Sequence, residues 1–289
     1  MSGSVAMRIT LIEVPYDCGR FGERMGSGPL ALAATLPPPL VSAGHEVEVR
    51  PVRLPERFFH EVAAVVALQH EVRREVAVAR AKGRLPVILS GNCGYAALGA
   101  TAALPPRVGV LWLDAHADFN TPESSPSGFF DGTCLATLAG RAWPAVSRRF
   151  DGFTPMEEER VVLLGARALD DVEREMLTDS DVSWLPPQAV RVDAAALPAA
   201  LDRLARRADR LYLHLDLDVI DPAELRANLY ACDGGLTVDE VAAAIAAAGE
   251  RLEIAAVSIT AFDAAADETQ RGPAVASRLL AAVTAAARR

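Results

Sequence analysis

Residues Val108–Asn120 read VGVLWLDAHADFN, and this stretch decides both the fold class and the place of the functional site. Its first half, Val108–Leu113, is a continuous apolar run, which is typical of a strand covered on both faces of a parallel sheet. Its second half carries Asp114, His116 and Asp118 at alternate positions. Alternate side chains of an extended chain point the same way, so we expect these three to converge at the carboxyl end of the strand.

Similar apolar runs recur along the chain and alternate with helical periodicity. The predicted strands are Arg8–Val14, Glu46–Val52, Leu85–Leu89, Val108–Leu113, Val161–Leu164, Leu211–Leu215 and Ala255–Ile259. The predicted helices are Phe58–Lys82, Asp170–Leu177, Leu197–Ala208, Val238–Ala248 and Ala274–Ala287. This alternation indicates an α/β fold with three αβα layers and a mostly parallel sheet. We expect one domain over residues 1–289, because single α/β domains reach this length and no linker or repeat interrupts the chain.

The composition and the net charge of the chain argue against some classes of binding partner. The 289 residues carry a formal net charge of −9 and have a pI near 5.1, so a basic groove for nucleic acid is not expected. There is no uncharged apolar run long enough to span a bilayer, and no secretory signal pattern at the N-terminus. Four scattered cysteines suit a reducing compartment better than a disulfide framework. We therefore expect a cytoplasmic protein with a small-molecule partner, and neither nucleic acid nor a membrane.

A second acidic pair follows another apolar strand. Leu211–Leu215 leads into Asp216 and Asp218, again at alternate positions. These carboxylates could instead cap turns, an alternative that we keep open above all for Asp221, which precedes a proline. Clustered carboxylates and an imidazole are costly to bury unless a cation is present. Oxygen-rich ligands with one imidazole favour Mn²⁺ or a similarly hard ion, and shared carboxylates could bridge two such ions about 3.5–4 Å apart.

These motifs resemble those of the arginase/agmatinase family of ureohydrolases. Asp114–Asn120 (DAHADFN) matches the family's Asp-Ala-His-x-Asp-x-Asn signature at every specified position, and His214–Pro222 (HLDLDVIDP) resembles its second metal motif. Arg20–Pro29 (RFGERMGSGP) and Gly234–Thr237 (GGLT) resemble further segments of the family. The resemblance implies a single arginase-like domain with two Mn²⁺ ions at the strand ends, where a metal-bridging hydroxide attacks a guanidinium carbon.

The resemblance also implies roles for individual residues. The implied metal ligands are Cys93, Asp114, His116, Asp118, Asp216 and Asp218. Asn120 and Ser127 resemble the residues that hold the α-carboxylate of the substrate. Asp170 resembles the carboxylate near its α-amino group, and Glu173 is a second candidate for that place. These residues favour a guanidino amino acid over agmatine, which has no carboxylate.

The segment Ser90–Cys93 (SGNC) departs from the family pattern, because Cys93 stands where the family has a metal-binding histidine. A thiolate can bind a metal, and a nearby divalent ion lowers the pKa of the thiol. It is nevertheless a softer ligand than imidazole, which bears on its affinity for Mn²⁺. The alternative is that Cys93 only fills space as a small buried side chain.

Two further departures concern catalysis. Asp131 stands in place of an acid/base histidine, and an aspartate of ordinary pKa is a poor acid for an amine leaving group. Either the pKa of Asp131 is raised so that it can shuttle a proton, or the chemistry depends less on this shuttle. Ala261 stands in place of a glutamate that binds the guanidinium group. Asp233 could supply a replacement carboxylate, and Asp263 and Glu268 are further candidates.

The departures predict a substrate that is less basic than arginine. An N-hydroxyguanidine carries an electron-withdrawing oxygen and is largely neutral near neutral pH, so its binding needs no full ion pair. The combination of Cys93, Asp131 and an amino-acid clamp resembles a family member that cleaves Nω-hydroxy-L-arginine into hydroxyurea and L-ornithine in antibiotic biosynthesis. An arginase, another amidinohydrolase and a metal-binding regulatory protein without catalysis remain alternatives. We expect a monomer, because Arg289 directly follows the last predicted helix, without the extended tail through which some arginases trimerise.

Overall fold

An eight-stranded sheet forms the centre of the computed structural model, which describes residues 6–55, 60–150 and 153–287. Its strands are β1 (Arg8–Val14), β4 (Glu46–Pro51), β5 (Leu85–Ser90), β6 (Val108–Leu113), β7 (Val161–Leu164), β8 (Ser183–Leu185), β9 (Arg210–Asp216) and β10 (Glu253–Thr260). They lie in the order β4-β1-β5-β10-β9-β6-β7-β8, and every pairing between them is parallel. A short antiparallel pair, β2 (Tyr16–Asp17) and β3 (Arg20–Phe21), lies apart from this sheet. The predicted fold class is confirmed.

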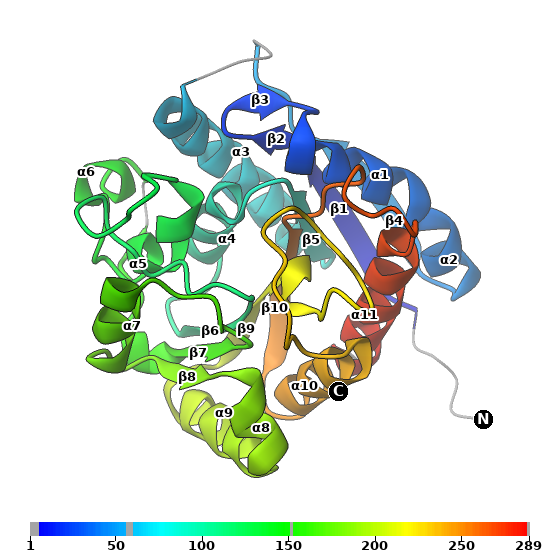
Figure 1. Ribbon diagram of the computed structural model, residues 1–289. Coiled ribbons are helices and arrows are strands. Elements are labelled where there is room, and N and C mark those ends of the chain that lie inside the picture. Colours follow the sequence, from blue (N-terminus) through cyan, green and yellow to red (C-terminus); the bar gives the residue numbers. More distant parts are fainter. Residues whose placement is uncertain (1–5, 56–59, 151–152, 288–289) are drawn as a thin grey trace.

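Helices cover both faces of the sheet, as Figure 1 shows. They are α1 (Ser27–Thr35), α2 (Pro37–Ser42), α3 (Glu61–Ala81), α4 (Ala97–Ala102), α5 (Cys134–Leu138), α6 (Pro144–Ser147), α7 (Asp171–Thr178), α8 (Pro187–Val192), α9 (Ala196–Arg207), α10 (Val238–Gly249) and α11 (Gly272–Ala286). One apolar core joins α1, α2, α9, α10 and α11 to one face of the sheet. A second core joins α3, α4, α5 and α7 to the other face. Both faces are therefore buried, which explains why the strands are continuous apolar runs.

The seven predicted strands are present, and β1, β6 and β7 have the predicted bounds. The helix predicted over Phe58–Lys82 corresponds to α3, which begins at Glu61 in the structure, while Phe58 and Phe59 lie outside the described residues. The prediction of seven strands missed β8, a half-buried strand of three residues at the edge of the sheet. The predicted helices also missed α2, whose three leading prolines suggest a break in a sequence but fit the first turn of a helix, where backbone N–H groups have no partner.

The strand order places the ends of β5, β10, β9 and β6 side by side at the middle of the sheet. Because all strands run parallel, the segments after them meet at one edge, where open α/β sheets bind their ligands. Chain segments far apart in the sequence, from the turn after β5 to the loop after β10, therefore face a common space (Figure 1). This edge carries the residues singled out above.

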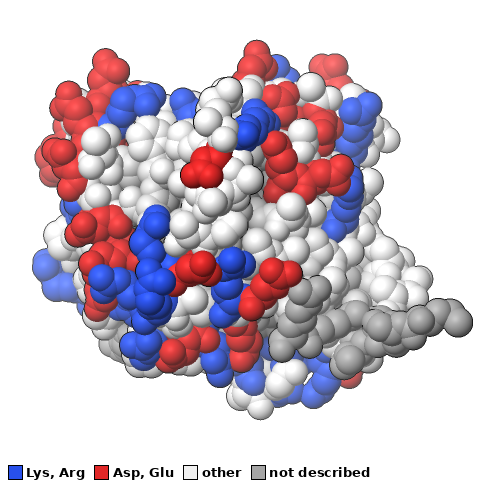
Figure 2. Space-filling model, turned by 90° about the horizontal axis from the view of Figure 1, so that it is seen from below, with Lys and Arg blue, Asp and Glu red and all other residues white. Residues whose placement is uncertain are grey.

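Charged side chains are mixed on the surface of the protein. On the face shown in Figure 2, basic and acidic side chains lie interspersed. Ion pairs also link different segments of the chain. Examples are Arg191 with Glu240 at 2.9 Å and Arg251 with Asp202 at 2.6 Å. Among the described helices, none combines the length and apolarity that crossing a membrane requires.

Candidate metal centre

One cavity of about 620 Å³ opens at the carboxyl edge of the sheet. All of the predicted metal ligands line it: Cys93, Asp114, His116, Asp118, Asp216 and Asp218. The predicted substrate-binding residues Asn120, Ser127, Asp170 and Glu173 line the same cavity, as does Asp131. The structure does not bring Asp233, Asp263 or Glu268 into its lining. Asp233 is exposed and contributes only its backbone carbonyl, to Arg167.

The segment after β6 converges on the cavity for a different reason from the predicted one. We expected Asp114, His116 and Asp118 to alternate along an extended strand, but β6 ends at Leu113. The following residues form no regular structure, and Asp118 has a left-handed backbone with φ of +50°. This conformation is rare for residues other than glycine, asparagine and aspartate. The predicted convergence holds, whereas its predicted geometry is wrong.

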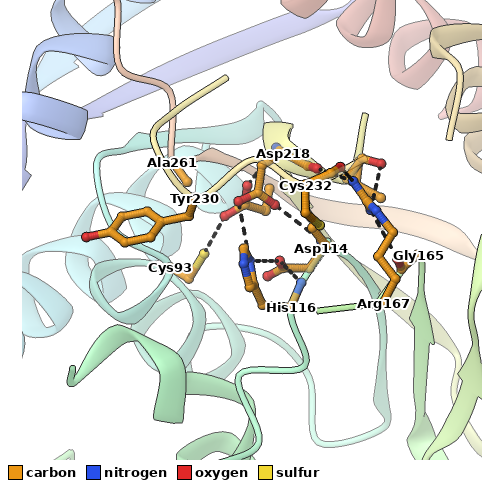
Figure 3. A network of polar contacts seen from close by, with 12 residues as sticks. Cys93, Asp114, His116, Gly165, Arg167, Asp218, Tyr230, Cys232 and Ala261 are labelled. Carbon is orange, nitrogen blue, oxygen red and sulfur yellow. Dashed lines mark hydrogen bonds and ion pairs between the residues drawn. The ribbon is translucent and has the colours of Figure 1, made fainter. Parts of the chain in front are cut away.

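The first group of potential ligands consists of Asp114, His116 and Asp218, whose ligand atoms all lie within 4.8 Å of one another. His116 Nδ1 lies 3.4 Å from Asp114 Oδ1 and 3.4 Å from Asp218 Oδ2 (Figure 3). The carboxylates also fix the backbone, because His116 N donates to Asp114 Oδ1 at 2.8 Å and Ala115 N donates to Asp218 Oδ1 at 3.2 Å. We call these three residues the histidine–carboxylate group.

The second group consists of Cys93, Asp114 and His214, again with ligand atoms within 4.8 Å of one another. The Cys93 thiol also donates to Asp216 Oδ2 at 3.2 Å. Asp114 belongs to both groups, as a carboxylate that bridges two ions would. His214 was not among the predicted site residues, although it precedes Asp216 and Asp218 at the same alternate spacing. We call Cys93, Asp114 and His214 the thiol–imidazole group.

The electrostatics of the cavity fit a cation. Burial raises the pKa of Asp114 to about 6, and burial together with neighbouring carboxylates raises the pKa of Asp118 and Asp216 well above the usual range. Burial also disfavours the charges of Asp218 and His116, but these two face each other, so the pKa of Asp218 is lowered and that of His116 is raised. Among the described residues that line the cavity, none is lysine or arginine. Divalent ions bound here would supply the missing positive charge.

The thiol and the imidazole of the second group are deeply buried. Burial and nearby carboxylates raise the pKa of the Cys93 thiol well above its usual range, so it is protonated unless a metal displaces the proton. Burial lowers the pKa of His214 to about 3, which keeps its imidazole neutral. A neutral imidazole is the form that binds metals.

Asp131 holds the turn that carries Cys93. Its Oδ2 accepts hydrogen bonds from the Asn92 side chain at 2.9 Å and from Cys93 N at 3.1 Å. Its Oδ1 accepts from Gly94 N at 2.7 Å and from the Cys134 thiol at 3.1 Å. Burial raises its pKa despite these bonds. A carboxylate whose two oxygens are engaged in this way is suited to positioning Cys93. The direction of its pKa shift is also the one that a proton shuttle at this position requires.

Of the predicted amino-acid contacts, Ser127 and Asp170 are exposed, whereas Asn120 and Glu173 are buried. Asn120 Nδ2 donates to Asp170 Oδ2 at 3.0 Å, which joins the two predicted binding residues. Glu173 accepts from Phe119 N at 2.8 Å, and burial raises its pKa to about 7. Ser127 is exposed beside the opening.

Sequence reasoning missed Asn228, which links several parts of the site. Its Nδ2 donates to Asp218 Oδ2 at 3.1 Å and to the Ala261 carbonyl at 2.8 Å, and its Oδ1 accepts from Tyr230 N at 2.8 Å. Ala261 needs such support because it has a left-handed backbone with φ of +58°. Asn228 is the tenth residue after Asp218, and its spacing gave no signal of this role.

Arg167 was also missed. Its guanidinium group donates to five backbone carbonyls, at distances from 2.7 to 3.3 Å (Figure 3). These carbonyls belong to Gly165, Asp218, Val219, Cys232 and Asp233. Arg167 therefore ties the loop after β7 to the backbone of Asp218 and to the segment after Tyr230. Every residue has a backbone carbonyl, whatever its side chain, so no sequence motif marks these contacts.

Comparison with known proteins gives a consistent result. The sequence profile of the arginase family matches residues 7–286. The arginase of Bacillus caldovelox is 29% identical over 290 residues, which cover 94% of this chain and 96% of that protein. The N(omega)-hydroxy-L-arginine amidinohydrolase of Streptomyces lavendulae is 33% identical over 206 residues, which cover 70% of each chain. The crystal structure of arginase from Bacillus cereus superimposes with a TM-score of 0.86 at 25% identity, covering 96% of this chain and 98% of that one.

Proposed function

The chain belongs to the arginase family of hydrolases, which act on the C–N bonds of guanidino groups, and from this premise we propose that its substrate is Nω-hydroxy-L-arginine. The products are hydroxyurea and L-ornithine. Hydrolysis adds water across the bond between the guanidino carbon and the nitrogen attached to the δ-carbon, which ornithine keeps as its δ-amino nitrogen. This nitrogen is called the δ-nitrogen below. The oxygen of water stays on the carbon, and a proton goes to the δ-nitrogen as that bond breaks.

The observation that carries this proposal is the scarcity of free carboxylates for a guanidinium cation. Apart from the predicted metal ligands, the carboxylates among the described lining residues are Asp131, Asp170 and Glu173. Asp131 already accepts four hydrogen bonds, and Asp170 accepts one from Asn120. Ala261 presents only a methyl group to the cavity. A cation without an ion-pair partner is costly to bury, so the cavity favours a guanidine that is largely neutral.

The outer residues suit the amino-acid end of this substrate. Asn120 and the exposed Ser127 offer donors for an α-carboxylate, and Asp170 offers an acceptor for an α-ammonium group. Glu173 lies behind them, where it accepts from the backbone of Phe119 and fixes the start of the loop. Holding the amino-acid end in this way orients the guanidino carbon toward the deeper ligand groups.

The residues present fit two divalent ions. The histidine–carboxylate and thiol–imidazole groups share Asp114, while Asp118 and Asp216 line the same space. We propose two Mn²⁺ as the ions bound when Mn²⁺ is the only divalent ion supplied. When bound, the ions would activate a water molecule as the nucleophile at neutral pH. Asp131, Asn228 and the ligand carboxylates themselves keep the ligand-bearing turns in place.

An arginase is the second candidate function, because the Bacillus caldovelox arginase matches over 94% of this chain. Steady-state hydrolysis by the Mn²⁺-loaded protein decides between the candidates, with L-arginine, agmatine and Nω-hydroxy-L-arginine as substrates. We expect hydroxyurea and L-ornithine from the hydroxylated substrate at the highest kcat/KM. Activity on L-arginine alone would contradict the proposed substrate, and no activity on any guanidine would favour a metal-binding regulatory protein. Asp218→Asn serves as the inactive control.

A further inference from the structure

His214 is a buried imidazole that the proposed reaction does not use. It lies on β9, and the parallel register pairs it with Trp112 on β6 and with Ser258 on β10. The Trp112 ring stacks on the imidazole with centroids 3.6 Å apart, and the side chain of His214 has no solvent exposure. The same face of β9 carries Asp216 two residues later, so the imidazole lies directly below the carboxylates of the cavity.

The two nitrogens of His214 have different surroundings. Nδ1 lies 2.8 Å from Ser258 Oγ and 3.2 Å from Tyr212 Oη, and the Tyr212 hydroxyl donates to Ser258 Oγ at 2.9 Å. Among the described residues, the polar contact of Nε2 is a long one of 3.4 Å, to Thr260 Oγ1. That hydroxyl also lies 3.2 Å from Cys93 Sγ. A hydrogen-bonded Nδ1 and a poorly satisfied Nε2 directed toward a thiol match the arrangement of metal-binding histidines, whose second nitrogen is fixed by an oxygen partner.

We propose that His214 Nε2 is a metal ligand, and that Cys93, Asp114 and His214 together form a subsite that takes Zn²⁺ in preference to Mn²⁺. This inference rests on the proposed two-ion centre and assigns an ion preference to one of its halves. A thiolate and an imidazole are the ligands that zinc prefers, whereas the oxygen-rich histidine–carboxylate group suits Mn²⁺. With both metals supplied, the centre holds one ion of each kind.

The neighbouring side chains support this subsite. Asp114 Oδ2 accepts from Trp112 Nε1 at 3.0 Å, so the same indole that stacks on His214 also orients the shared carboxylate. Asp131 fixes the backbone on both sides of Cys93. Each of the three ligands is thus oriented by a residue that does not bind the metal, as is typical of metal sites in proteins.

X-ray absorption at the zinc edge tests the proposal on the unaltered protein. Metal-free protein is loaded with equimolar Mn²⁺ and Zn²⁺, and the bound metals are counted by elemental analysis. We expect one zinc per chain, with one sulfur scatterer at about 2.3 Å and one imidazole per zinc. Sulfur without imidazole would exclude His214 as a ligand, and zinc without sulfur would exclude the subsite. Neither result depends on hydrolysis, so the ion preference and the proposed substrate fail separately.

Variants provide a second readout. His214→Gln should weaken Zn²⁺ binding at this subsite by about tenfold or more, while one Mn²⁺ per chain is retained. His70→Gln is the matched control, because His70 is exposed on α3 and does not line the cavity. Co²⁺ should give a thiolate charge-transfer band in the unaltered protein and in His70→Gln, but not in Cys93→Ser. Unchanged zinc affinity in His214→Gln would overturn the proposal.

Discussion

The two halves of the cavity differ in how closely their side chains follow the pattern expected from the sequence. The half at the ends of β9, β6 and β7 retains the pattern expected from the sequence, with Asp114, His116 and Asp218 holding one another and the backbone between them. The half around the ends of β5 and β10 is altered, with Cys93 and Ala261 in place of the expected side chains. Asp131, the third altered residue, comes from the segment after β6 and contacts the turn of Cys93. We call these the retained half and the altered half.

The two halves differ in which residues hold the ligand-bearing turns. In the retained half the ligands themselves accept the backbone hydrogen bonds, so removing a ligand also loosens its turn. In the altered half the turn of Cys93 is held by Asp131, which is not among the predicted ligands. A thiol accepts hydrogen bonds poorly, so a separate carboxylate must satisfy the buried N–H groups around it. Asp131 and the turn of Cys93 are thus linked by hydrogen bonds.

The largest effect should come from Asp114→Asn, because Asp114 belongs to both ligand groups. We expect kcat/KM to fall by about a thousandfold or more, since activation by the ions contributes several kcal/mol. Elemental analysis should show loss of both ions. Cys93→Ser provides the comparison, with one ion lost and the other largely retained. Two metals per chain in Cys93→Ser would show that Cys93 only fills space, and the two halves would then not differ as described.

Asp131→Asn should have the next largest effect. The amide replaces one acceptor oxygen with a donor that faces other donors, so we expect a loss of about 1–3 kcal/mol in the free energy of unfolding. The ion on the Cys93 side should be lost and activity should fall by about 10- to 100-fold. Denaturant unfolding and elemental analysis measure both.

Cys134→Ser is the matched control for Asp131, because serine keeps a donor toward Asp131 Oδ1. It should change stability and metal content little. If Asp131→Asn instead left both unchanged and altered only the pH dependence of kcat, Asp131 would act as a proton shuttle.

A smaller, pH-dependent effect should come from Glu173 in the retained half. Its pKa is raised from 4.5 to about 7 in the folded protein, so the folded state binds more protons than the unfolded state between these values. Stability therefore falls as pH rises from about 4.5 to 7, and it stays lower above that range. Glu173→Gln keeps an acceptor for Phe119 N and removes this titration. In metal-free protein, we expect the variant to gain about 1–2 kcal/mol over the unaltered chain across this range. Parallel unfolding curves at every pH would contradict the assignment.

The fold followed from the sequence because its decisive elements are local and strongly patterned. β6 and β7 are continuous apolar runs, and their bounds were predicted from these runs. β8 escaped prediction because three half-buried residues show no periodicity. No prediction covered α2, although prolines at its start fit a helix N-terminus.

The candidate site could be predicted only where the types and spacing of side chains indicate metal binding. The alternate acidic positions identified Asp114 and Asp218, although the backbone after β6 is not the extended strand that we assumed. His214 has the same spacing, but a histidine inside an apolar strand also fits a simple core residue. Arg167 and Asn228 act on backbone carbonyls and on residues distant in the sequence, so only the folded chain reveals them.

The most direct test of the altered half is the ratio of kcat/KM for Nω-hydroxy-L-arginine to that for L-arginine, measured in the unaltered protein and in Ala261→Glu. Ala261 lines the cavity, so a glutamate there would offer the missing carboxylate to a guanidinium cation. We predict a ratio well above one in the unaltered protein and a fall of about 10- to 100-fold in the variant, as expected for one charged hydrogen bond. A preference for L-arginine in the unaltered protein, or the same ratio in both proteins, would contradict selection of a less basic guanidine by the altered half.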